Sequence, residues 1–184
     1  MGDTTTEPDA IQLLTADHAE VEAMFTQIES APLGDARSRM VGDVIRGLSV
    51  HAAIEEQVLY PVMRKELPDG ETLVGEALRE HQQVKKTLSA IEKADSVIQR
   101  DPLLVQLISD VRHHVAEEET ELFPKLQASI RRSELQELGT KLAAAKKMAP
   151  THPHPHAPNT PPANVVAGAA AAVMDKARDA LGRD

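Results

Sequence analysis

A repeat of 63 residues is the feature that most constrains how this chain folds. Each half contains a histidine, a second histidine 33 positions later, and a glutamate four positions after that. These residues are His18, His51 and Glu55 in the first half, and His81, His114 and Glu118 in the second half. The offsets 81 − 18 and 114 − 51 are both 63, so the halves carry the same spacing. The pattern predicts one metal site assembled from two copies of a helical hairpin.

Four segments carry apolar residues at every third or fourth position, which is typical of helices that bury one face. The segments run from residue 11 to 28, from 41 to 62, from 74 to 91 and from 104 to 122. Every candidate ligand occupies a place in the apolar stripe, so we expect it to point inward. Pro61 and Pro124 are expected to kink or end their helices just beyond the site, because proline removes a helical hydrogen bond.

Three turn signals separate these helices. They lie at residues 31–35 and 67–70, and a weaker one ends at Asp101-Pro102. In an antiparallel hairpin, residues at the same height lie equally far from the turn. The midpoints of positions 18 and 51, of 55 and 81, and of 81 and 114 are 34.5, 68 and 97.5, within or just before these signals. The sequence therefore predicts an all-α fold, an up-down-up-down four-helix bundle with its candidate ligands in one layer.

The composition of the flanking segments predicts the rest of the organisation. We expect a disordered N-terminus at 1–8, the bundle with a short extra helix at 9–148, a Pro/His-rich linker at 149–163 and a helical tail at 164–184. The histidines at positions 152, 154 and 156 alternate with proline in the linker. A solvated linker is the favoured interpretation of this stretch, and weak chelation of a metal is the alternative.

The composition also excludes several classes of function. A formal net charge of −9 argues against nucleic acid as a partner, and two Phe and one Tyr provide no platform for stacking bases. The absence of cysteine excludes disulfides and thiolate metal sites. The N-terminal residues do not resemble a signal peptide, and no segment approaches the ~20 apolar residues of a transmembrane helix. We therefore expect a cytoplasmic protein without a transmembrane segment.

Histidine and glutamate four residues apart share one face of a helix and can reach the same ion. Imidazole nitrogen together with carboxylate oxygen suits iron, manganese or zinc. The two oxygens of Glu55 and of Glu118 would allow each carboxylate to bridge two ions, and an oxide or hydroxide bridge would offset part of the remaining positive charge. Without a metal, burying these groups in an apolar layer would cost several kcal/mol each.

On these residues, the chain resembles the hemerythrin-like family of HHE cation-binding domains. The resemblance covers roughly residues 9–127, and its His…His-x-x-x-Glu repeat is specific. It implies a four-helix bundle around a non-haem di-iron centre, with two iron ions that are oxo- or hydroxo-bridged. Carried onto this sequence, it implies the metal ligands His18, His51, Glu55, His81, His114 and Glu118.

One position departs from the oxygen-carrying members of that family. They have a fifth histidine four residues after the third-helix histidine, where this chain has Lys85, and the repeat partner of Lys85 is Glu22. This weakens the case for reversible oxygen carriage and favours reaction with peroxide or nitric oxide, or release of iron. Glu22 is interpreted as a solvated charge, with an additional ligand as the alternative. Tyr60 is interpreted as a packing residue because Phe123 fills the matching place, with an outer-shell donor or a ligand as the alternative.

The leading prediction for function is a small di-iron protein that binds or consumes oxygen, hydrogen peroxide or nitric oxide in the handling of oxidative or nitrosative stress. Catalase-like disproportionation of hydrogen peroxide would need no organic cofactor. Two alternatives stay open. One is a non-catalytic oxygen or nitric oxide sensor, or an iron store or donor, whose C-terminal tail contacts a protein partner. The other is a structural bundle that holds zinc.

Overall fold

The computed structural model describes residues 7–181, and all regular secondary structure within them is helical. The four long helices are α1 (Ala10–Ser30), α2 (Asp35–Ile54), α4 (Gly70–Lys93) and α5 (Val97–Glu117). The shorter elements are η1 (Glu55–Leu59), α3 (Tyr60–Glu66), η2 (Glu118–Leu122), α6 (Phe123–Ser129), α7 (Arg132–Lys146) and α8 (Ala163–Leu181). The predicted all-α class is confirmed. Of the predicted disordered N-terminus at 1–8, residues 1–6 lie outside the described part of the chain.

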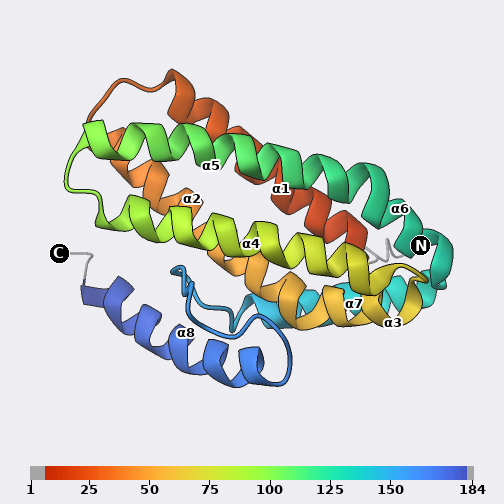
Figure 1. The fold of residues 1–184 in the computed structure, drawn as a ribbon. Coiled ribbons are helices and arrows are strands. Elements are labelled where there is room, and N and C mark those ends of the chain that lie inside the picture. The colour runs from red at the N-terminus through yellow and green to blue at the C-terminus, as the bar shows by residue number, and fades with distance from the viewer. Residues whose placement is uncertain (1–6, 182–184) are drawn as a thin grey trace, which may run out of the picture.

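The four long helices lie side by side, and each runs opposite to the one before it because tight turns connect them (Figure 1). Two apolar cores fill the interior, one on either side of the layer of candidate ligands. The first contains Leu14 and Leu126, and α7 covers it by packing along α1. The second contains Phe25 and Leu107, toward the turn between α1 and α2. The candidate ligands thus lie between two packed apolar regions.

Local sequence determines where α1 begins and how it turns into α2. The Asp9 carboxylate accepts a hydrogen bond from the Gln12 backbone N–H at 3.0 Å, and the Gln12 side chain accepts one from the Asp9 backbone N–H at 3.1 Å. This reciprocal cap satisfies two N–H groups that have no partner inside the helix. Gly34 makes the following turn with φ of 151°, a value that residues with a side chain rarely adopt.

The third turn lies a few residues earlier than predicted. It occupies residues 94–96, where the Ser96 hydroxyl accepts a hydrogen bond from the Gln99 backbone N–H at 3.4 Å and caps α5. The prediction of a turn ending at Asp101-Pro102 is therefore wrong, because Pro102 lies inside α5. Proline is tolerated there because it stands close to the start of the helix, where only one hydrogen bond is lost.

A wide, π-helical turn directly before Pro61 lets the helix continue past this proline. In η1 the Tyr60 backbone N–H donates to the Glu55 carbonyl, five residues back, and the same arrangement recurs 63 residues later before Pro124. The wide turn accommodates the proline ring and its missing N–H. It also rotates the residues beyond it. Tyr60, nine residues and about two and a half regular turns after His51, consequently faces the site and not the opposite side.

The segment after α7 folds back onto the bundle and lies against α2 and α4 (Figure 1). Asp175 of α8 is buried and accepts the backbone N–H groups of Thr151 at 2.9 Å and of His152 at 3.1 Å. The His152 ring contacts Glu92 of α4 and Asp179 of α8. The linker is therefore anchored and not freely solvated as predicted, because its histidines meet carboxylates that are distant in sequence.

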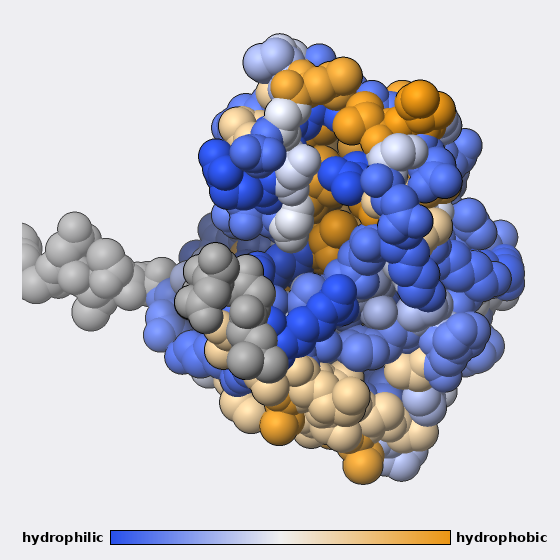
Figure 2. All heavy atoms as spheres, turned by 90° about the vertical axis from the view of Figure 1, so that its left-hand side faces the viewer, coloured by the Kyte–Doolittle hydropathy of each residue, from blue (hydrophilic) through white to orange (hydrophobic). Residues whose placement is uncertain are grey.

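The outward side of α8 carries exposed apolar residues, including Val166, Val173 and Met174. Figure 2, which looks toward the end of the bundle with the first and third turns, shows apolar atoms along this lower edge of the molecule. Across residues 7–181, no helix has the length and apolar character that crossing a membrane requires.

Candidate metal centre

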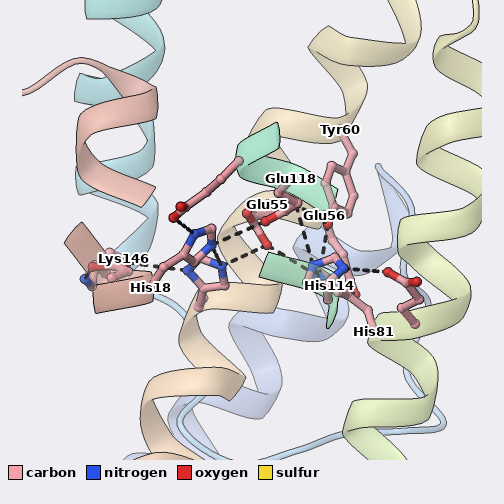
Figure 3. Close-up of polar contacts among 12 residues, drawn as sticks. His18, Glu55, Glu56, Tyr60, His81, His114, Glu118 and Lys146 are labelled. Carbon is pink, nitrogen blue, oxygen red and sulfur yellow. Dashed lines mark hydrogen bonds and ion pairs between the residues drawn. The ribbon is translucent and has the colours of Figure 1, made fainter. Parts of the chain in front are cut away.

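The structure brings the six predicted ligands together in the middle of the bundle (Figure 3). Their donor atoms form two overlapping groups, and the donors of each group all lie within 4.8 Å of one another. The groups are His18, His51, Glu55 and Glu118, and Glu55, His81 and His114. All six side chains are buried. Their convergence supports the predicted role as ligands of a metal.

The four imidazoles meet as two pairs. Nε2 of His18 lies 3.2 Å from Nε2 of His51, and Nε2 of His81 lies 3.0 Å from Nε2 of His114. If the ring protons are on Nδ1, the facing Nε2 atoms direct lone pairs at each other. Such a pair is unfavourable by itself and is stabilised by a shared proton or by a cation between the rings.

Each central glutamate touches one histidine of each pair. Oε2 of Glu55 lies 3.2 Å from Nε2 of His51 and 3.4 Å from Nε2 of His81. Glu118 uses both of its oxygens instead of one. Oε2 lies 3.3 Å from Nε2 of His18 and Oε1 lies 3.6 Å from Nε2 of His114. Both carboxylates therefore span the gap between the two imidazole pairs.

Each imidazole meets another carboxylate at its Nδ1 atom. The Nδ1–oxygen distances are 2.8 Å for His18–Glu119, 3.1 Å for His81–Glu56, 2.6 Å for His114–Glu80 and 3.7 Å for His51–Asp17. These partners follow the repeat as well, since 119 − 56 and 80 − 17 are both 63. A carboxylate at Nδ1 fixes the ring and leaves Nε2 free as an acceptor, which is how proteins usually hold histidines that bind metals.

The long His51–Asp17 distance has a local cause. Asp17 forms an ion pair at 2.5 Å with Lys146, which belongs to α7 and has no counterpart after the first hairpin. The four outer carboxylates were not predicted from the sequence, because acidic residues beside a buried stripe resemble ordinary surface charges. The signal that identifies them is positional: each one directly precedes or follows a candidate ligand, and each pair keeps the 63-residue offset.

The electrostatics of the metal-free centre show how strongly its charges interact. Burial by itself raises the pKa of Glu55, but His51 and His81 outweigh it and hold that pKa well below its ordinary value. Burial by itself lowers the pKa of His51, yet the carboxylates of Glu55 and Asp17 raise it to about 10. The same opposition raises the pKa of His81 to about 9, through Glu55 and Glu56. In the absence of a metal, protons therefore provide the positive charge that the carboxylates require.

The donor set fits metal cations. Both oxygens of Glu55 and Oε2 of Glu118 are buried and lack a hydrogen-bond partner among the described residues. A buried carboxylate without partners is costly, so these oxygens call for positive charge. Four nitrogen donors and two carboxylates provide the mixed coordination that divalent transition metals prefer.

Two further predicted residues have different outcomes. The Tyr60 hydroxyl donates a hydrogen bond to Oε1 of Glu118 at 3.1 Å and lies 3.0 Å from Nε2 of His81, so it belongs to the centre. Burial, together with nearby carboxylates such as that of Glu118, raises its pKa well above the ordinary value. Glu22 lies outside the centre, because its carboxylate forms an exposed ion pair with Arg112 at 2.7 Å. This placement agrees with the favoured interpretation of Glu22 as a solvated charge, and not with the alternative of an additional ligand.

The Hemerythrin HHE cation binding domain matches residues 9–126 of the chain. The chain belongs to the hemerythrin HHE cation-binding family. An uncharacterized hemerythrin-like protein of Schizosaccharomyces pombe is 32% identical over 167 residues, which are 90% of this chain and 82% of that protein. The match therefore extends beyond the HHE domain itself. Membership in a family of cation-binding domains agrees with the buried His/Glu cluster.

Two further proteins are similar to this chain at lower sequence identity. The crystal structure of a Hemerythrin HHE cation binding domain-containing protein from Mycobacterium kansasii has a TM-score of 0.66 and 24% identity, and covers 76% of this chain and 86% of that one. At this level of identity, the likeness shows that the two chains share the helical fold. A DNA nickase of Nostoc is 27% identical over 135 residues, which are 73% of this chain and 38% of the nickase.

Proposed function

We propose that this HHE protein is a non-haem di-iron protein that binds and reacts with a small oxidant: oxygen, hydrogen peroxide or nitric oxide. The observation that carries the proposal is the pairing of the imidazoles. Two histidine pairs face each other across Glu55 and Glu118, and each of these carboxylates contacts both pairs. Two ions, one for each histidine pair, with both glutamates shared between them, account for this arrangement.

The choice of iron rests on the donors and on the family. His18 and His51 would hold one ion, and His81 and His114 the other, with the two glutamates bridging. This set of nitrogen and oxygen donors suits iron. It differs from structural zinc sites, which are usually rich in cysteine thiolates, because this chain has no cysteine. Iron bound there would supply Lewis acidity and one-electron chemistry.

A small cavity beside the histidines suits a ligand of two or three atoms. It has a volume of about 30 Å³ and is lined by the four histidines and by apolar side chains that include Val21, Leu48 and Val84. A volume of this size is near that of one water molecule, so the cavity admits a diatomic molecule or peroxide and excludes larger substrates.

Tyr60 supplies a proton donor on one side of the centre. Its phenol remains protonated at physiological pH, because burial and the Glu118 carboxylate raise its pKa. The hydroxyl donates to Glu118 and contacts Nε2 of His81. We infer that it stabilises the negative charge of that carboxylate and holds a proton beside the centre, where the reduction of an oxidant would require one.

The decisive test of the metal is metal analysis of freshly purified protein together with its near-ultraviolet and visible spectrum. We expect close to two irons per chain and absorption from a ferric pair. A protein that contains only zinc and is colourless contradicts the proposal. A His51→Ala variant serves as the matched control and is expected to lose both the iron and the absorption.

Turnover distinguishes an enzyme from a binding module. Iron-loaded protein is expected to consume hydrogen peroxide faster than the same concentration of free iron, and His51→Ala is expected to lose this excess. If the spectrum responds to oxygen, peroxide or nitric oxide without turnover, the protein is a sensor or an iron store. The nickase activity named for the Nostoc relative is not proposed here, since this chain spans 38% of that protein and a net charge of −9 disfavours binding to DNA.

A further inference from the structure

A surface groove between α1 and α5 leads toward the cavity beside the histidines. It has a volume of about 490 Å³, and small residues such as Thr15, Ala19 and Ala116 line it and leave it open. The groove and the inner cavity share four lining residues: His18, Val21, Val111 and Val115. These residues line both spaces, and the candidate ligand His18 is one of them. We call this depression the α1/α5 groove.

The repeat places an equivalent position between α2 and α4, and there the surface is covered. Ala53, Glu56 and Gln57 are the repeat partners of Ala116, Glu119 and Thr120 in the α1/α5 groove. They line a space of only about 40 Å³, whose other wall is made by the C-terminal segment, including His154, Asn164 and Gly168. The linker and α8 thus lie where the repeat alone would leave a second groove.

The outer carboxylates of Glu119 and Glu56 differ in exposure between the open side and the covered side of the centre. Glu119 holds Nδ1 of His18 and its side chain is 38% exposed, whereas Glu56 holds Nδ1 of His81 and its side chain is 3% exposed. The two residues have the same task and the same place in the repeat. What separates them is the C-terminal segment above Glu56, where the Asn164 side chain donates to the Glu56 backbone carbonyl at 3.2 Å.

On the covered side, the Lys85 side chain also fills space beside Glu56. Lys85 donates to both oxygens of Glu56, at 2.7 Å and 2.6 Å, and its side chain is only 12% exposed. Its repeat partner Glu22 turns outward to Arg112 instead. The same repeat position therefore closes one side of the centre and leaves the other side open.

Specific contacts hold the C-terminal segment in this place. The buried Asp175 accepts from two backbone N–H groups of the linker and lies 3.1 Å from Nε2 of His154. Asp179 accepts from Arg46 of α2 at 2.9 Å. A Cβ atom at Gly168 would lie 2.9 Å from the Gln57 side-chain nitrogen Nε2, so α8 approaches the bundle closely at this position. The C-terminal segment is therefore held against the bundle by specific side-chain contacts.

We propose that small ligands reach the centre through the α1/α5 groove beside His18, and that the C-terminal segment is a plug that closes the equivalent route beside His81. The proposal rests on the proposed function, because it assigns the access route of that same centre. Another hollow, between α1 and α2, shares only Val21 and His51 with the inner cavity, and the Asp17–Lys146 ion pair bridges it. The α1/α5 groove therefore shares four lining residues with the inner cavity, against two for this hollow.

The first experiment fills the open groove in the full-length, iron-loaded protein. The variant Ala19→Leu/Ala116→Leu adds bulk at two exposed positions of the groove, and Ala16→Leu makes the same change at an exposed position of α1 outside it. Azide is the probe, and its association is followed by stopped-flow absorption. We expect the double variant to bind azide about tenfold more slowly, and Ala16→Leu to match the natural protein. An unchanged rate in a fully iron-loaded double variant would overturn the route.

The second experiment releases the plug in the filled protein. Asp175→Ala removes the anchor of the linker, and Lys176→Ala alters an exposed neighbour on the same helix as the control. In the Ala19→Leu/Ala116→Leu background, Asp175→Ala is expected to restore fast azide association, because it opens the route beside His81. Lys176→Ala is expected to restore nothing. A filled protein that remains slow after Asp175→Ala, although proteolysis shows the linker to be released, would overturn the plug.

A third measurement does not depend on iron. In the metal-free protein, modification of individual histidines by diethyl pyrocarbonate is followed by peptide mass spectrometry. Filling the groove is expected to slow modification of His18, and Asp175→Ala is expected to speed modification of His81, each compared with the same histidine in the natural chain. If the protein takes up no iron, the proposed function fails while this measurement still decides the two routes. Equal rates for both histidines in all variants would contradict the proposal.

Discussion

The two halves of the bundle agree in everything that would hold a metal. Each contributes two histidines, one central glutamate and two outer carboxylates, and all of these keep the offset of 63 residues. Each half also passes its proline through a wide turn directly after the glutamate. The repeated elements therefore determine the number and type of donors, and they place those donors in one layer.

The halves differ in what surrounds the donors. Tyr60 donates a hydrogen bond inside the centre, whereas its partner Phe123 stacks on His18 with ring centres 5.7 Å apart. Lys85 fills the side of the second histidine pair, and the C-terminal segment covers it. Under the proposed function, the shared residues would hold the ions, and the unshared residues would control access and supply a proton.

Replacing either central glutamate tests the shared part with the largest expected effect. Glu55→Gln and Glu118→Gln keep the side-chain shape but remove a carboxylate that contacts both histidine pairs. Because losing an outer carboxylate alone lowers metal affinity about 10- to 100-fold, we expect each variant to weaken binding of both ions by more than about 100-fold. Metal titration followed by calorimetry measures this. The exposed Glu117→Gln is the control.

The two glutamate variants are also expected to behave alike. If the carboxylates are shared, each single change affects both ions. A variant that loses one ion and keeps the other at its natural affinity would show that each half holds its own ion, and the proposed bridging would be wrong.

The pH dependence of stability is expected to change sign with metal. In the metal-free protein, the pKa of His51 is raised to about 10 and that of His81 to about 9. A raised pKa stabilises the fold below the ordinary histidine value and loses that contribution as pH rises through the folded value. The metal-free protein should therefore lose a few kcal/mol of unfolding free energy between about pH 7 and about pH 10.

The iron-loaded protein is expected to show the opposite trend over the same range. Metal binding requires neutral imidazoles, so it displaces these protons and becomes more favourable as pH rises. Denaturant unfolding of both forms across the range checks the prediction. If the metal-free protein also gained stability with rising pH, the protonated imidazoles would not be the groups that stabilise its centre.

The outer carboxylates provide a matched comparison between the open and the covered side. Glu119→Gln and Glu56→Gln are each expected to lower metal affinity about 10- to 100-fold, because each orients one histidine. Only Glu56→Gln also leaves the ammonium of Lys85 without its carboxylate in a partly buried place. We therefore expect Glu56→Gln to cost about 2 kcal/mol more of unfolding free energy in the metal-free protein. Equal losses in urea unfolding would mean that the covered side is not closed.

The repeat made the central ligands predictable from sequence, because each of them interrupts an apolar stripe that helical periodicity defines. The same offset of 63 residues relates Glu56 and Glu119, although both lie outside the apolar stripe. Tyr60 was harder, since regular helical geometry turns it away from the centre and only the wide turn before Pro61 brings it back. The turn near Asp101 was misplaced because proline is a weak stop signal close to the start of a helix.

The position of the C-terminal segment could not be predicted from pattern. Its contacts join residues that are far apart in sequence, such as Asp175 with the linker and Asp179 with Arg46. No periodicity relates these partners, and the alternation of proline and histidine is equally consistent with a free linker. Docking of this kind depends on the shape of the groove between α2 and α4, which exists only after the bundle has formed.

The smallest expected effect concerns the pair Tyr60 and Phe123, and it tests whether the asymmetry lies in one hydroxyl. Tyr60→Phe gives both halves a phenylalanine at this repeat position. It removes one hydrogen bond to the Glu118 carboxylate, so we expect a loss of about 1–2 kcal/mol of unfolding free energy, with the fold and both ions retained. Urea unfolding and metal analysis measure the two outcomes.

Tyr60 also reports on its own environment, since it is the one tyrosine of the chain and there is no tryptophan. Burial and the neighbouring carboxylates raise its pKa well above the ordinary value, so phenolate absorption should appear only as the metal-free protein unfolds at alkaline pH. The double variant Tyr60→Phe/Phe123→Tyr moves the hydroxyl to the side of His18. If the phenol acts as a proton donor because of its position, peroxide consumption should fall in Tyr60→Phe and recover at least partly in the double variant. Equal activity in all three proteins would reduce Tyr60 to a packing residue.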